Sequence, residues 1–551
     1  MCIVRARLLL AFGLLCLPPA LPAAEKTAAL ADCGQPGVTE LAAIRGLDQP
    51  ALAEGTAVVV EATVTASFPG DAQLSGFYLQ QELPRAGVFV YAPDLTADTA
   101  PRAGERWRVL ARTGRYRGRV QLEWVEDLRR CGESQPRPAI LDPGDPEAYA
   151  VHEDQLVTLD TPLVVADTYE LGRYGSLRLA IGGRAFTANN GVSAGRLLPL
   201  RLDDGSYRRD PRPVPHLGNQ GVRRAGDRLL GVTGILTRAF GAWRIHPVSN
   251  PVFSPDNPRP EMPAAAAAGG LRVLQLNLRN YFLDLGQRGA ASAEALTRQR
   301  ARLRQLIRPL SADVLVLHEV QNTVAAVDDL LAILNEGLPE DLHYRAALDA
   351  RSPAAIRSVV LYRDSQARKV RTLRLVDDAH PRDPLVVEFM QPDGKRWGIL
   401  AAHFKSRGGC PDAGDTDRGE GCWAQRRERQ SDSLLEWLSG HSLLPADHYP
   451  MLVLADFNAY AEEAAMQTWH MAGFMDLIAR EIPAERRYTY IYRGQSGYLD
   501  HALATPAMRE YLASIELWPV NADEPAYLSD EGKAIWRISD HDPMVIDLRL
   551  P

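Results

Sequence analysis

Hydrophobic and polar positions alternate over much of the first quarter of the chain. Val58, Val60, Ala62 and Val64 occupy every second position of one run, and shorter runs of the same kind follow up to about residue 125. A period of two is that of a strand with one buried face, and Gly and Pro residues separate the runs. Short strands at this spacing predict a small β-barrel or β-sandwich near the N-terminus.

The β pattern contains a weak internal repeat. Residues 102–110 read Arg-Ala-Gly-Glu-Arg-Trp-Arg-Val-Leu, and residues 224–232 read Arg-Ala-Gly-Asp-Arg-Leu-Leu-Gly-Val. A turn and a further strand pattern follow each segment, ending at Trp124 and at residues 243–245. Two related β modules would explain this similarity, and chance is the alternative.

The pattern changes after residue 270. Residues 250–270 are rich in Pro, then contain five alanines and two glycines, which predicts a linker. Beyond them, short apolar runs alternate with amphipathic helical patterns: the runs cover 271–276, 314–317, 359–361 and 451–454, and the helical patterns cover 293–307 and 424–438. Buried strands interleaved with helices predict a layered α/β domain.

Composition and charge narrow the class of protein. The chain has 551 residues, which is too long for a single ordinary hydrophobic core. Of these residues, 46% are hydrophobic and 24% are charged, which excludes a disordered or fibrous protein. The formal net charge of -7 argues against a protein that coats DNA through electrostatic attraction. This net charge does not exclude an enzyme that makes brief phosphate contacts and carries a metal cation.

The N-terminus has the order of features found in a secretory signal peptide. An apolar run over residues 8–17 is preceded by arginines and followed by small residues, namely Arg5, Arg7, Ala20, Ala23 and Ala24. A buried N-terminal helix is the alternative interpretation. The run is too short to span a membrane, and no later segment is apolar enough to do so. We therefore expect a secreted or periplasmic protein without a membrane anchor, with residues 1–24 removed.

Four of the six cysteines lie beyond the expected cleavage site: Cys33, Cys131, Cys410 and Cys422. An even number in an exported chain favours disulfides, and three pairings are possible. We favour Cys33–Cys131, which would bracket the first β domain, and Cys410–Cys422, which would close a short loop rich in Gly and Asp. A zinc site is the alternative, but the spacing fits no usual zinc pattern.

Polar residues occur at the ends of the apolar strands in the C-terminal half. They are Asn277, Glu319, His403, Asp456, Asn458, Asp500, His501, Asp540 and His541. A polar group buried at a strand end must be paired or bind something; one such residue is usually a cap, but so many in one domain indicate a site. Oxygen ligands suit Mg²⁺, and carboxylates and histidines around such a metal suit hydrolysis of a phosphate ester.

These residues resemble the motifs of the endonuclease/exonuclease/phosphatase superfamily, to which the pancreatic deoxyribonuclease family belongs. The matching segments are Leu-Asn277, His-Glu319-Val-Gln, His403-Phe-Lys-Ser, Ala-Asp456-Phe-Asn458, Leu-Asp500-His and Ser-Asp540-His541-Asp-Pro. Residues 76–80, 87–91 and 521–525 also resemble secreted bacterial nucleases of this superfamily that carry an N-terminal OB-like region. The resemblance implies a four-layer α/β sandwich, two packed sheets flanked by helices, with the site at one edge.

The resemblance also implies roles for the metal ligands. Glu319 and Asp540 would hold Mg²⁺, supported by Asn277. Mn²⁺ is an acceptable substitute for Mg²⁺, and a separate structural Ca²⁺ site is left open. Asp456 and Asn458 would orient the water and contact the scissile phosphate.

Two histidines complete the implied mechanism. His541 would be the general base, with its tautomer fixed by Asp500, and His403 would stabilise the phosphoryl oxygens or assist the leaving group. The chain departs from the family pattern near the second histidine, because residues 355–357 read Ala-Ile-Arg where relatives have an acidic residue to orient it. The role of His403 is therefore not assigned. For His501 we favour a structural role over a catalytic one.

A basic run in the first β domain is a second candidate site. Arg115 and Arg117 flank Tyr116, a pattern that on an OB-like barrel would track a phosphate backbone while the aromatic ring stacks on a base. A solvated strand face is the alternative.

The sequence thus predicts a multi-domain α+β protein. The expected parts are a signal peptide (1–24), an OB-like β domain (25–135), a second β-rich module (136–250), a linker (251–270) and the catalytic domain (271–551). The expected function is that of a secreted, Mg²⁺-dependent nuclease acting on DNA, with RNA left open and no protein partner implied. Alternatives are an enzyme of the same fold acting on a phospholipid or small phosphoester, and a non-catalytic exported binding protein.

Overall fold

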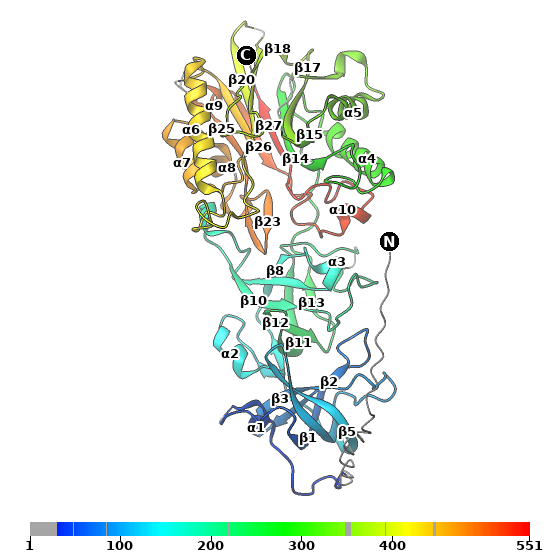
Figure 1. Cartoon of the computed structure of the whole chain (residues 1–551). Coiled ribbons are helices and arrows are strands. Elements are labelled where there is room, and N and C mark those ends of the chain that lie inside the picture. The colour runs from blue at the N-terminus through cyan, green and yellow to red at the C-terminus, as the bar shows by residue number, and fades with distance from the viewer. Residues whose placement is uncertain are drawn as a thin grey trace, which may run out of the picture.

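The computed structural model describes residues 30–550, apart from residues 48, 84, 219–220, 348–353, 392 and 445–447. The expected signal peptide lies outside the described residues. Figure 1 shows an elongated molecule in which a barrel, a second β module and a layered domain follow one another along one axis. In the part of the chain that the structure describes, no helix is long and apolar enough to cross a membrane.

The predicted small barrel is present. Its five strands close in the order β1-β2-β3-β5-β4, with β3 and β5 parallel and the other neighbours antiparallel. The strands are β1 (Ala57–Phe68), β2 (Gly76–Glu82), β3 (Arg85–Tyr91), β4 (Glu105–Tyr116) and β5 (Arg119–Glu133), and helix α1 (Leu41–Arg45) precedes them. The alternating residues Val58, Val60, Ala62 and Val64 all point into the barrel core, as their period predicts.

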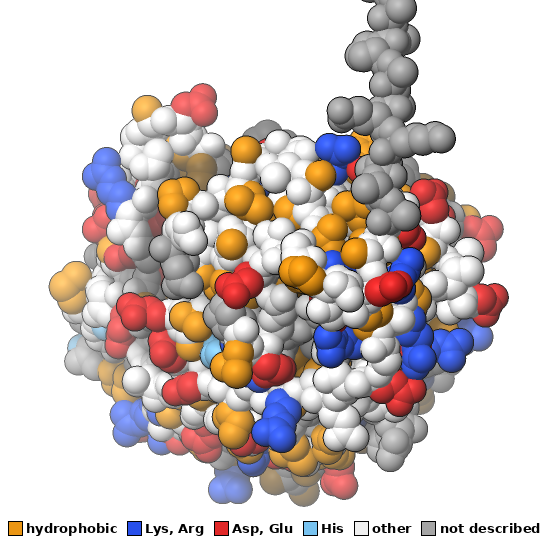
Figure 2. Space-filling model, turned by 90° about the horizontal axis from the view of Figure 1, so that it is seen from below, with side chains coloured by type: hydrophobic (Ala, Val, Ile, Leu, Met, Phe, Trp, Pro, Cys, Tyr) orange, Lys and Arg blue, Asp and Glu red, His pale blue; other side chains and the backbone are white. Residues whose placement is uncertain are grey.

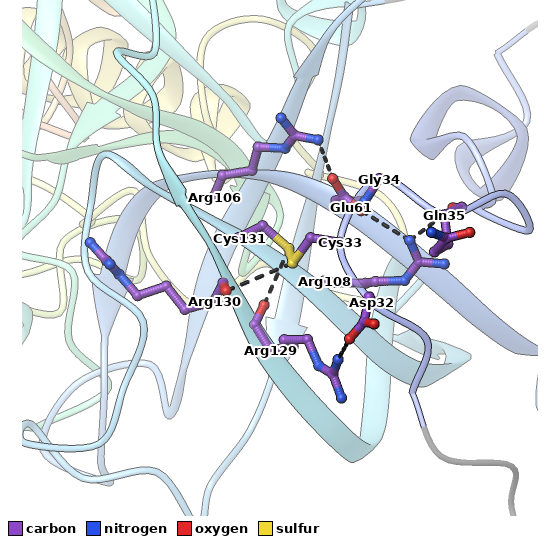
Figure 3. Close-up of a disulfide and its surroundings, with 10 residues drawn as sticks. All are labelled: Asp32, Cys33, Gly34, Gln35, Glu61, Arg106, Arg108, Arg129, Arg130 and Cys131. Atoms are coloured by element: carbon purple, nitrogen blue, oxygen red, sulfur yellow. Dashed lines mark hydrogen bonds and ion pairs between the residues drawn. A yellow bond between two sulfur atoms is a disulfide. The ribbon is translucent and has the colours of Figure 1, made fainter.

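Both favoured disulfides are present. Cys33–Cys131 joins the segment before the barrel to its last strand across 98 residues, with a Cα–Cα distance of 5.5 Å (Figure 3). Next to it, the half-exposed Arg106 and the buried Arg108 converge on Glu61, which also accepts a hydrogen bond from the Gly34 N–H at 3.0 Å. Cys410–Cys422 closes a short loop, with a Cα–Cα distance of 5.2 Å.

The second β module has the same strand order. The pairings close a ring β8-β9-β10-β12-β11, with β10 and β12 parallel, and three further strands extend it. Its strands are β6 (Ala139–Ile140), β7 (Gln155–Leu159), β8 (Leu163–Asp167), β9 (Leu177–Ile181), β10 (Arg196–Leu202), β11 (Arg228–Ala239), β12 (Ala242–Pro247) and β13 (Val252–Ser254). Helices α2 (Pro146–Val151) and α3 (Leu171–Tyr174) and the turn η1 (Ala188–Asn190) connect them.

The internal repeat reflects this shared order. The repeated segments 102–110 and 224–232 lead into β4 and β11, which hold the same place in the two rings. Each is followed by the strand that pairs in parallel with the third strand of its ring. The sequence similarity therefore marks two modules with one topology.

The C-terminal part contains two six-stranded sheets. The first has the order β16 (Tyr344–Ala346), β17 (Ile356–Arg363), β15 (Val314–Gln321), β14 (Leu271–Tyr281), β27 (Met544–Leu548) and β26 (Leu512–Leu517). The second has the order β18 (Arg368–Arg374), β19 (Leu385–Met390), β20 (Arg396–His403), β21 (Met451–Asp456), β25 (Asp500–Ala504) and β22 (Met475–Asp476). A separate hairpin consists of β23 (Tyr490–Tyr492) and β24 (Gln495–Gly497).

Helices cover the outer face of each sheet. The main ones are α4 (Ala293–Leu310) and α5 (Val324–Asn335) on the first sheet, and α6 (Ala424–Gly440) and α7 (Ala464–Met471) on the second. Shorter elements are η2 (Glu340–Leu342), α8 (Leu477–Glu481), η3 (Ala484–Arg486), α9 (Pro506–Arg509) and α10 (Leu528–Glu531). One hydrophobic cluster joins the two sheets, and one more lies under each helical layer. This is a layered α/β arrangement, as the alternating pattern predicted.

The expected linker is not a free connection. Residues 255–270 form neither helix nor strand, yet Asn257 donates a hydrogen bond to Asp523 at 2.7 Å. Arg259 forms a bidentate ion pair with Glu524 at 2.7 and 3.0 Å. The segment is therefore held against the C-terminal domain by polar contacts.

Candidate active site

Strand ends from both sheets meet at one edge. Across the second sheet, Asp456 is the register partner of His403 on one side and of Asp500 on the other. In the first sheet, Asn277 is opposite His318, the residue before Glu319. Adjacent strands thus deliver these polar side chains to the same place, although they lie far apart in the chain.

Two overlapping groups of side chains share Asp456. Glu319, His403 and Asp456 form one group, and Asp456, Asp500 and His541 form the other; within each group the ligand atoms lie within 4.8 Å of one another. Asn277 bridges the carboxylates by donating its amide hydrogens to Asp456 at 3.0 Å and to Glu319 at 3.3 Å.

His541 and Asp500 form a buried pair. His541 Nδ1 lies 2.7 Å from Asp500 Oδ2, and the Thr489 hydroxyl donates to the same oxygen at 2.7 Å. Burial disfavours the charge on His541, but the attraction of Asp500 outweighs it and raises the pKa of His541 well above its usual value. Burial also opposes the charge on Asp500, yet His541 and Thr489 lower the pKa of that carboxyl.

The backbone around His541 is fixed from two sides. Asn521 Nδ2 donates to the His541 carbonyl oxygen at 2.6 Å. The Ser539 hydroxyl donates to the Asn277 carbonyl at 2.7 Å and accepts from the His541 N–H at 3.2 Å. The Tyr490 ring lies against the imidazole, with 4.8 Å between ring centroids. The histidine loop is therefore tied to β14 and to the β23–β24 hairpin.

Unusual backbone conformations place two of the acidic and amide groups. Glu319 has φ 62° at an irregularity in the pairing of β15 with β17, and Asn458 has φ 51° just after β21. Asn tolerates the left-handed region, whereas Glu adopts it only where the surroundings enforce it. The Asn458 N–H donates to Asp456 at 3.0 Å, and its side-chain amide donates to the Phe404 carbonyl at 3.3 Å.

His403 is fully buried and neutral. Burial, together with the nearby Arg382, lowers the pKa of His403 well below its usual value. Its Nε2 lies 3.4 Å from Asp456 Oδ2, while its Nδ1 has no hydrogen-bond partner among the residues that the structure describes. The unpartnered Nδ1 agrees with the absence of an acidic residue at 355–357, which the sequence showed.

The donor set fits a hard divalent cation. Burial and the crowding of Asp456 by the carboxylates of Asp500 and Glu319 raise its pKa to about 7. A divalent cation would offset that crowding, and carboxylate oxygens are the ligands that Mg²⁺ takes in proteins. Glu319 and Asp456 are placed to hold it.

Two expected metal ligands are placed less directly. Asp540 belongs to neither group; it lines a neighbouring cavity, although its charge still reaches His541. Asn277 turns its amide hydrogens, not its oxygen, towards the carboxylates, and its Oδ1 accepts the Arg279 N–H at 2.9 Å. Direct ligation by Asn277 would require its amide to rotate.

His501 has a structural role. It is completely buried, its Nε2 lies 2.9 Å from the Ala459 carbonyl oxygen, and its ring packs on Tyr498. Because neighbours on a strand point to opposite faces, Asp500 faces the site and His501 faces away from it.

Several residues of the site were not anticipated from the sequence. They are Thr489, Tyr490, Asn521, Ser539 and Arg382, which contact the candidate catalytic residues or perturb their charge. Residues 521–525 and Ser539 belong to segments that resemble family motifs, so that resemblance could have pointed to them. Thr489 and Tyr490 carried only an alternation of aromatic residues, which indicates a strand and no chemistry.

The basic run of the first barrel lies apart from these residues. Arg117 lies over the rings of Tyr116 and Phe240, at 5.4 and 5.3 Å, and Arg115 is 3.6 Å from Glu54. Tyr116 and Arg117 line a cavity of about 600 Å³ whose other walls come from the second β module. None of the residues lining this cavity belongs to residues 271–550.

Comparison with known proteins identifies the C-terminal part. The model of the Endonuclease/Exonuclease/phosphatase family matches residues 274–541, just under half of the chain, and this part is similar to that family. Members of this family hydrolyse phosphoester bonds. No curated protein matches the sequence.

Solved structures resemble about half of the chain. The catalytic domain of human Nocturnin is 16% identical, with a TM-score of 0.36 and coverage of 52% of this chain and 97% of that one. D. rerio TDP2 complexed with single-strand DNA product is 14% identical, with a TM-score of 0.34 and coverage of 51% and 98%. Bacteroides thetaiotaomicron mannosyl-6-phosphatase is 15% identical, with a TM-score of 0.34 and coverage of 50% and 99%.

Proposed function

We propose that this protein is an exported, Mg²⁺-dependent phosphodiesterase that hydrolyses nucleic acid. The observation that carries the proposal is the buried His541–Asp500 pair beside a cluster of carboxylates from two sheets. A positioned base next to a cation-binding cluster is the arrangement that hydrolysis of a phosphodiester requires.

His541 acts as the general base. Its Nδ1 faces Asp500, so the neutral ring carries its hydrogen on Nδ1 and its Nε2 can accept a proton from water; a divalent cation bound nearby would favour this neutral form against the raised pKa. Asp500 then stabilises the imidazolium that forms, and Thr489 keeps Asp500 in place. Tyr490 and the Asn521 contact hold the ring and its backbone in this orientation.

The remaining polar groups bind and orient the reacting phosphate. Asp456 and Asn458 position the attacking water and one phosphate oxygen, and their mutual hydrogen bond fixes the spacing. His403 is neutral because of its low pKa, so it contributes a hydrogen bond and no charge.

Glu319 and Asp456 would hold Mg²⁺, and Asp540 from the adjoining cavity wall and Asn277, after rotation of its amide, would complete the set. When bound, the cation polarises a phosphoryl oxygen and offsets the charge that develops there. Mn²⁺ is expected to substitute, since it also prefers oxygen ligands.

The first barrel is proposed to be an OB-like module that contacts the substrate. Its strand order, with β3 parallel to β5, supports that assignment. Arg115, Tyr116 and Arg117 lie at the tip of its β4–β5 hairpin and supply a base-stacking ring and phosphate-binding charge. Figure 2 views the barrel end of the molecule from below, where acidic and basic side chains are interspersed on the visible face.

Export to the periplasm or the medium is part of the proposal. The two disulfides support it, because such bonds persist in oxidising compartments. Cell fractionation and N-terminal sequencing would check it, with a mature chain expected to start near residue 24 or 25. A full-length cytoplasmic product would contradict export.

The activity is tested with purified protein and a panel of plasmid DNA, single-stranded DNA, RNA, a phospholipid and a simple phosphodiester. We expect nucleic acid to be cleaved, EDTA to abolish cleavage and Mg²⁺ to restore it. His541→Ala should lose about 10³-fold or more in kcat while its circular dichroism stays unchanged. His441→Ala, at an exposed histidine after α6, is the control. Cleavage of the phospholipid alone, or of nothing, would contradict the proposal.

A further inference from the structure

A cleft separates the second β module from the catalytic domain. Its volume is about 610 Å³. Residues 167–170 and Arg178 of the module form one wall, and Arg279, residues 490–493 and Asp540 form the opposite wall. The cleft therefore exists only when both parts of the chain are present.

The cleft opens directly beside the candidate base. Asp540, the residue before His541, lines it, and so does Tyr490, whose ring lies 4.8 Å from the His541 imidazole. A chain whose phosphate is at His541 would therefore place the adjoining nucleotide in this cleft.

Exposed aromatic rings come from both walls. Tyr169 of the module is 66% exposed and Tyr492 of the hairpin is 52% exposed, although large apolar rings are usually buried. Tyr492 also lies parallel to Tyr490, at 12° and 6.5 Å between ring centroids. Such rings form a platform on which planar bases stack with little regard to sequence.

Four arginines and four acidic residues line the cleft, and three of the acidic residues lie within 4.0 Å of an arginine. The acidic groups of the module wall are engaged, since Asp167 and Glu170 lie 4.0 and 3.7 Å from Arg178. Among the described residues, Arg279 and Arg493 have no carboxylate partner, and both are exposed. The walls therefore combine rings for a base with guanidinium groups for a phosphate.

Buried ion pairs fix the two walls relative to each other. Arg184 of the module pairs with Asp523 at 2.9 Å, and Arg224 pairs with Glu524 at 2.8 Å. Backbone hydrogen bonds between Thr187 and Ser496 and between Ser496 and Ala185, at 3.0 and 2.8 Å, add to them. A preformed cleft binds without the cost of closing on its ligand.

We infer that this cleft binds the nucleotide next to the scissile phosphate, and that single-stranded nucleic acid is the preferred substrate. The inference rests on the proposed function. A base can reach the tyrosines only after leaving its stack, and unstacking and unpairing cost free energy in a duplex but much less in a single strand. The second β module is then one wall of the substrate site.

The test compares Tyr492→Ala and Tyr169→Ala with Tyr174→Ala, at an exposed tyrosine of the same module that does not line the cleft. The probes are a 20-nucleotide oligothymidylate, its duplex with oligoadenylate, and a single strand of abasic residues with the same number of phosphates. Each cleft variant should raise KM for the oligothymidylate about tenfold with little change in kcat. KM for the abasic strand should not change, and Tyr174→Ala should behave as the wild type.

Three outcomes would overturn the inference while leaving the proposed function intact: unchanged KM in both cleft variants, an equal rise in KM for the abasic strand, or wild-type preference for the duplex. Failure of the wild type to cleave any nucleic acid with Mg²⁺ would instead overturn the proposed function, and the inference with it. Circular dichroism and kcat show that each variant is folded.

Discussion

The two β modules share a strand order but differ in how they meet the rest of the chain. Among the described residues, the first barrel has no hydrogen bond or ion pair to residues 271–550, whereas the second module has many. The first barrel is thus an attached module, whereas the second module, which has the same topology, forms a wall of the candidate active site.

The junction between the two modules combines packed rings with buried polar contacts. Phe68, Tyr78 and Phe89 of the barrel pack with Leu156 and Ile235 of the second module. Arg45 of the barrel also pairs with Glu153 at 2.7 Å, and Arg119 lies 3.8 Å from Asp154. This junction joins the barrel to the molecule without reaching the catalytic residues.

The junction with the catalytic domain is ionic and buried. Asp523 and Glu524 have no side-chain exposure, and their partners Arg184 and Arg224 come from the second module. The same loop contains Asn521, which holds the His541 carbonyl. The junctions differ in what they reach: the second module contacts the loop that supports His541, whereas, among the described residues, the polar contacts of the barrel stop at the second module.

Truncation gives the largest expected effect. Removing both modules, residues 25–254, deletes Arg184 and Arg224, the partners of Asp523 and Glu524 in the loop that holds His541, while Asn257 and Arg259 remain. We expect this fragment to be unfolded or to lose turnover on every substrate. Removing residues 25–136 alone should leave kcat unchanged and raise KM for long nucleic acids.

These two truncations are measured side by side by thermal unfolding and by kcat and KM. Full turnover in the shorter fragment would contradict the structural role of the second module. Loss of kcat in the longer one would show that the barrel acts on the catalytic site.

Substitution of one residue, Arg224, tests whether the second module supports the loop that contains Asn521. Arg224 pairs with Glu524 and donates hydrogen bonds to three carbonyl oxygens, including that of Pro519 at 2.6 Å. Arg224→Met should lower the free energy of unfolding by about 3 kcal/mol or more and reduce kcat, because the Asn521 loop loses its support. Arg228→Met, at a partly exposed ion pair with Asp256, is the control and should cost at most about 1 kcal/mol. Equal effects of the two changes would contradict the distinction.

Local patterns were enough to predict many of the elements. The alternation at 58–64 became β1, and the helical patterns at 293–307 and 424–438 became α4 and α6 with ends shifted by a few residues. Periodicity reports which face of an element is buried, so it predicts elements and layers well. The strand-end residues also converged, because parallel neighbours end at the same edge.

Contacts between distant loops could not be predicted in this way. No local pattern along the chain brings Tyr490 to His541 or joins Arg224 to Glu524, since these pairs depend on the packing of whole domains. The same holds for Asp540, which the motif assigned to the metal and the structure places on the wall of the cleft. Motifs report residue identity, whereas side-chain direction is set by tertiary structure.

Loss of the first disulfide should have a moderate effect confined to the barrel. Cys33→Ser with Cys131→Ser frees a loop of 98 residues, and a loop of this size contributes up to about 4 kcal/mol to stability. We expect the barrel to unfold at a lower temperature while kcat on a simple phosphodiester stays at the wild-type value. Scanning calorimetry and kinetics check this, and a parallel fall in kcat would contradict the separation of the barrel from the site.

The smallest expected effect is the change in stability when Asp204, at the junction between the two β modules, titrates. Burial and the neighbouring Asp203 raise the pKa of Asp204 to about 7, and the adjoining Ser206 hydroxyl donates to the Ala72 carbonyl of the barrel. A raised pKa means that the folded state holds the proton, so this stabilisation is complete below about pH 4 and is lost as the pH rises through 7.

Asp204→Asn should therefore match the wild type near pH 5 and exceed it near pH 8 by on the order of 1 kcal/mol, after allowance for partial exposure. Asp203→Asn should do the opposite: although burial opposes it, His246 and Arg244 lower the pKa of Asp203, so its carboxylate stabilises the fold near neutral pH. Unfolding temperatures of both variants from pH 5 to 8 distinguish these signs. A wild-type pH slope in Asp204→Asn would show that the junction is insensitive to this charge.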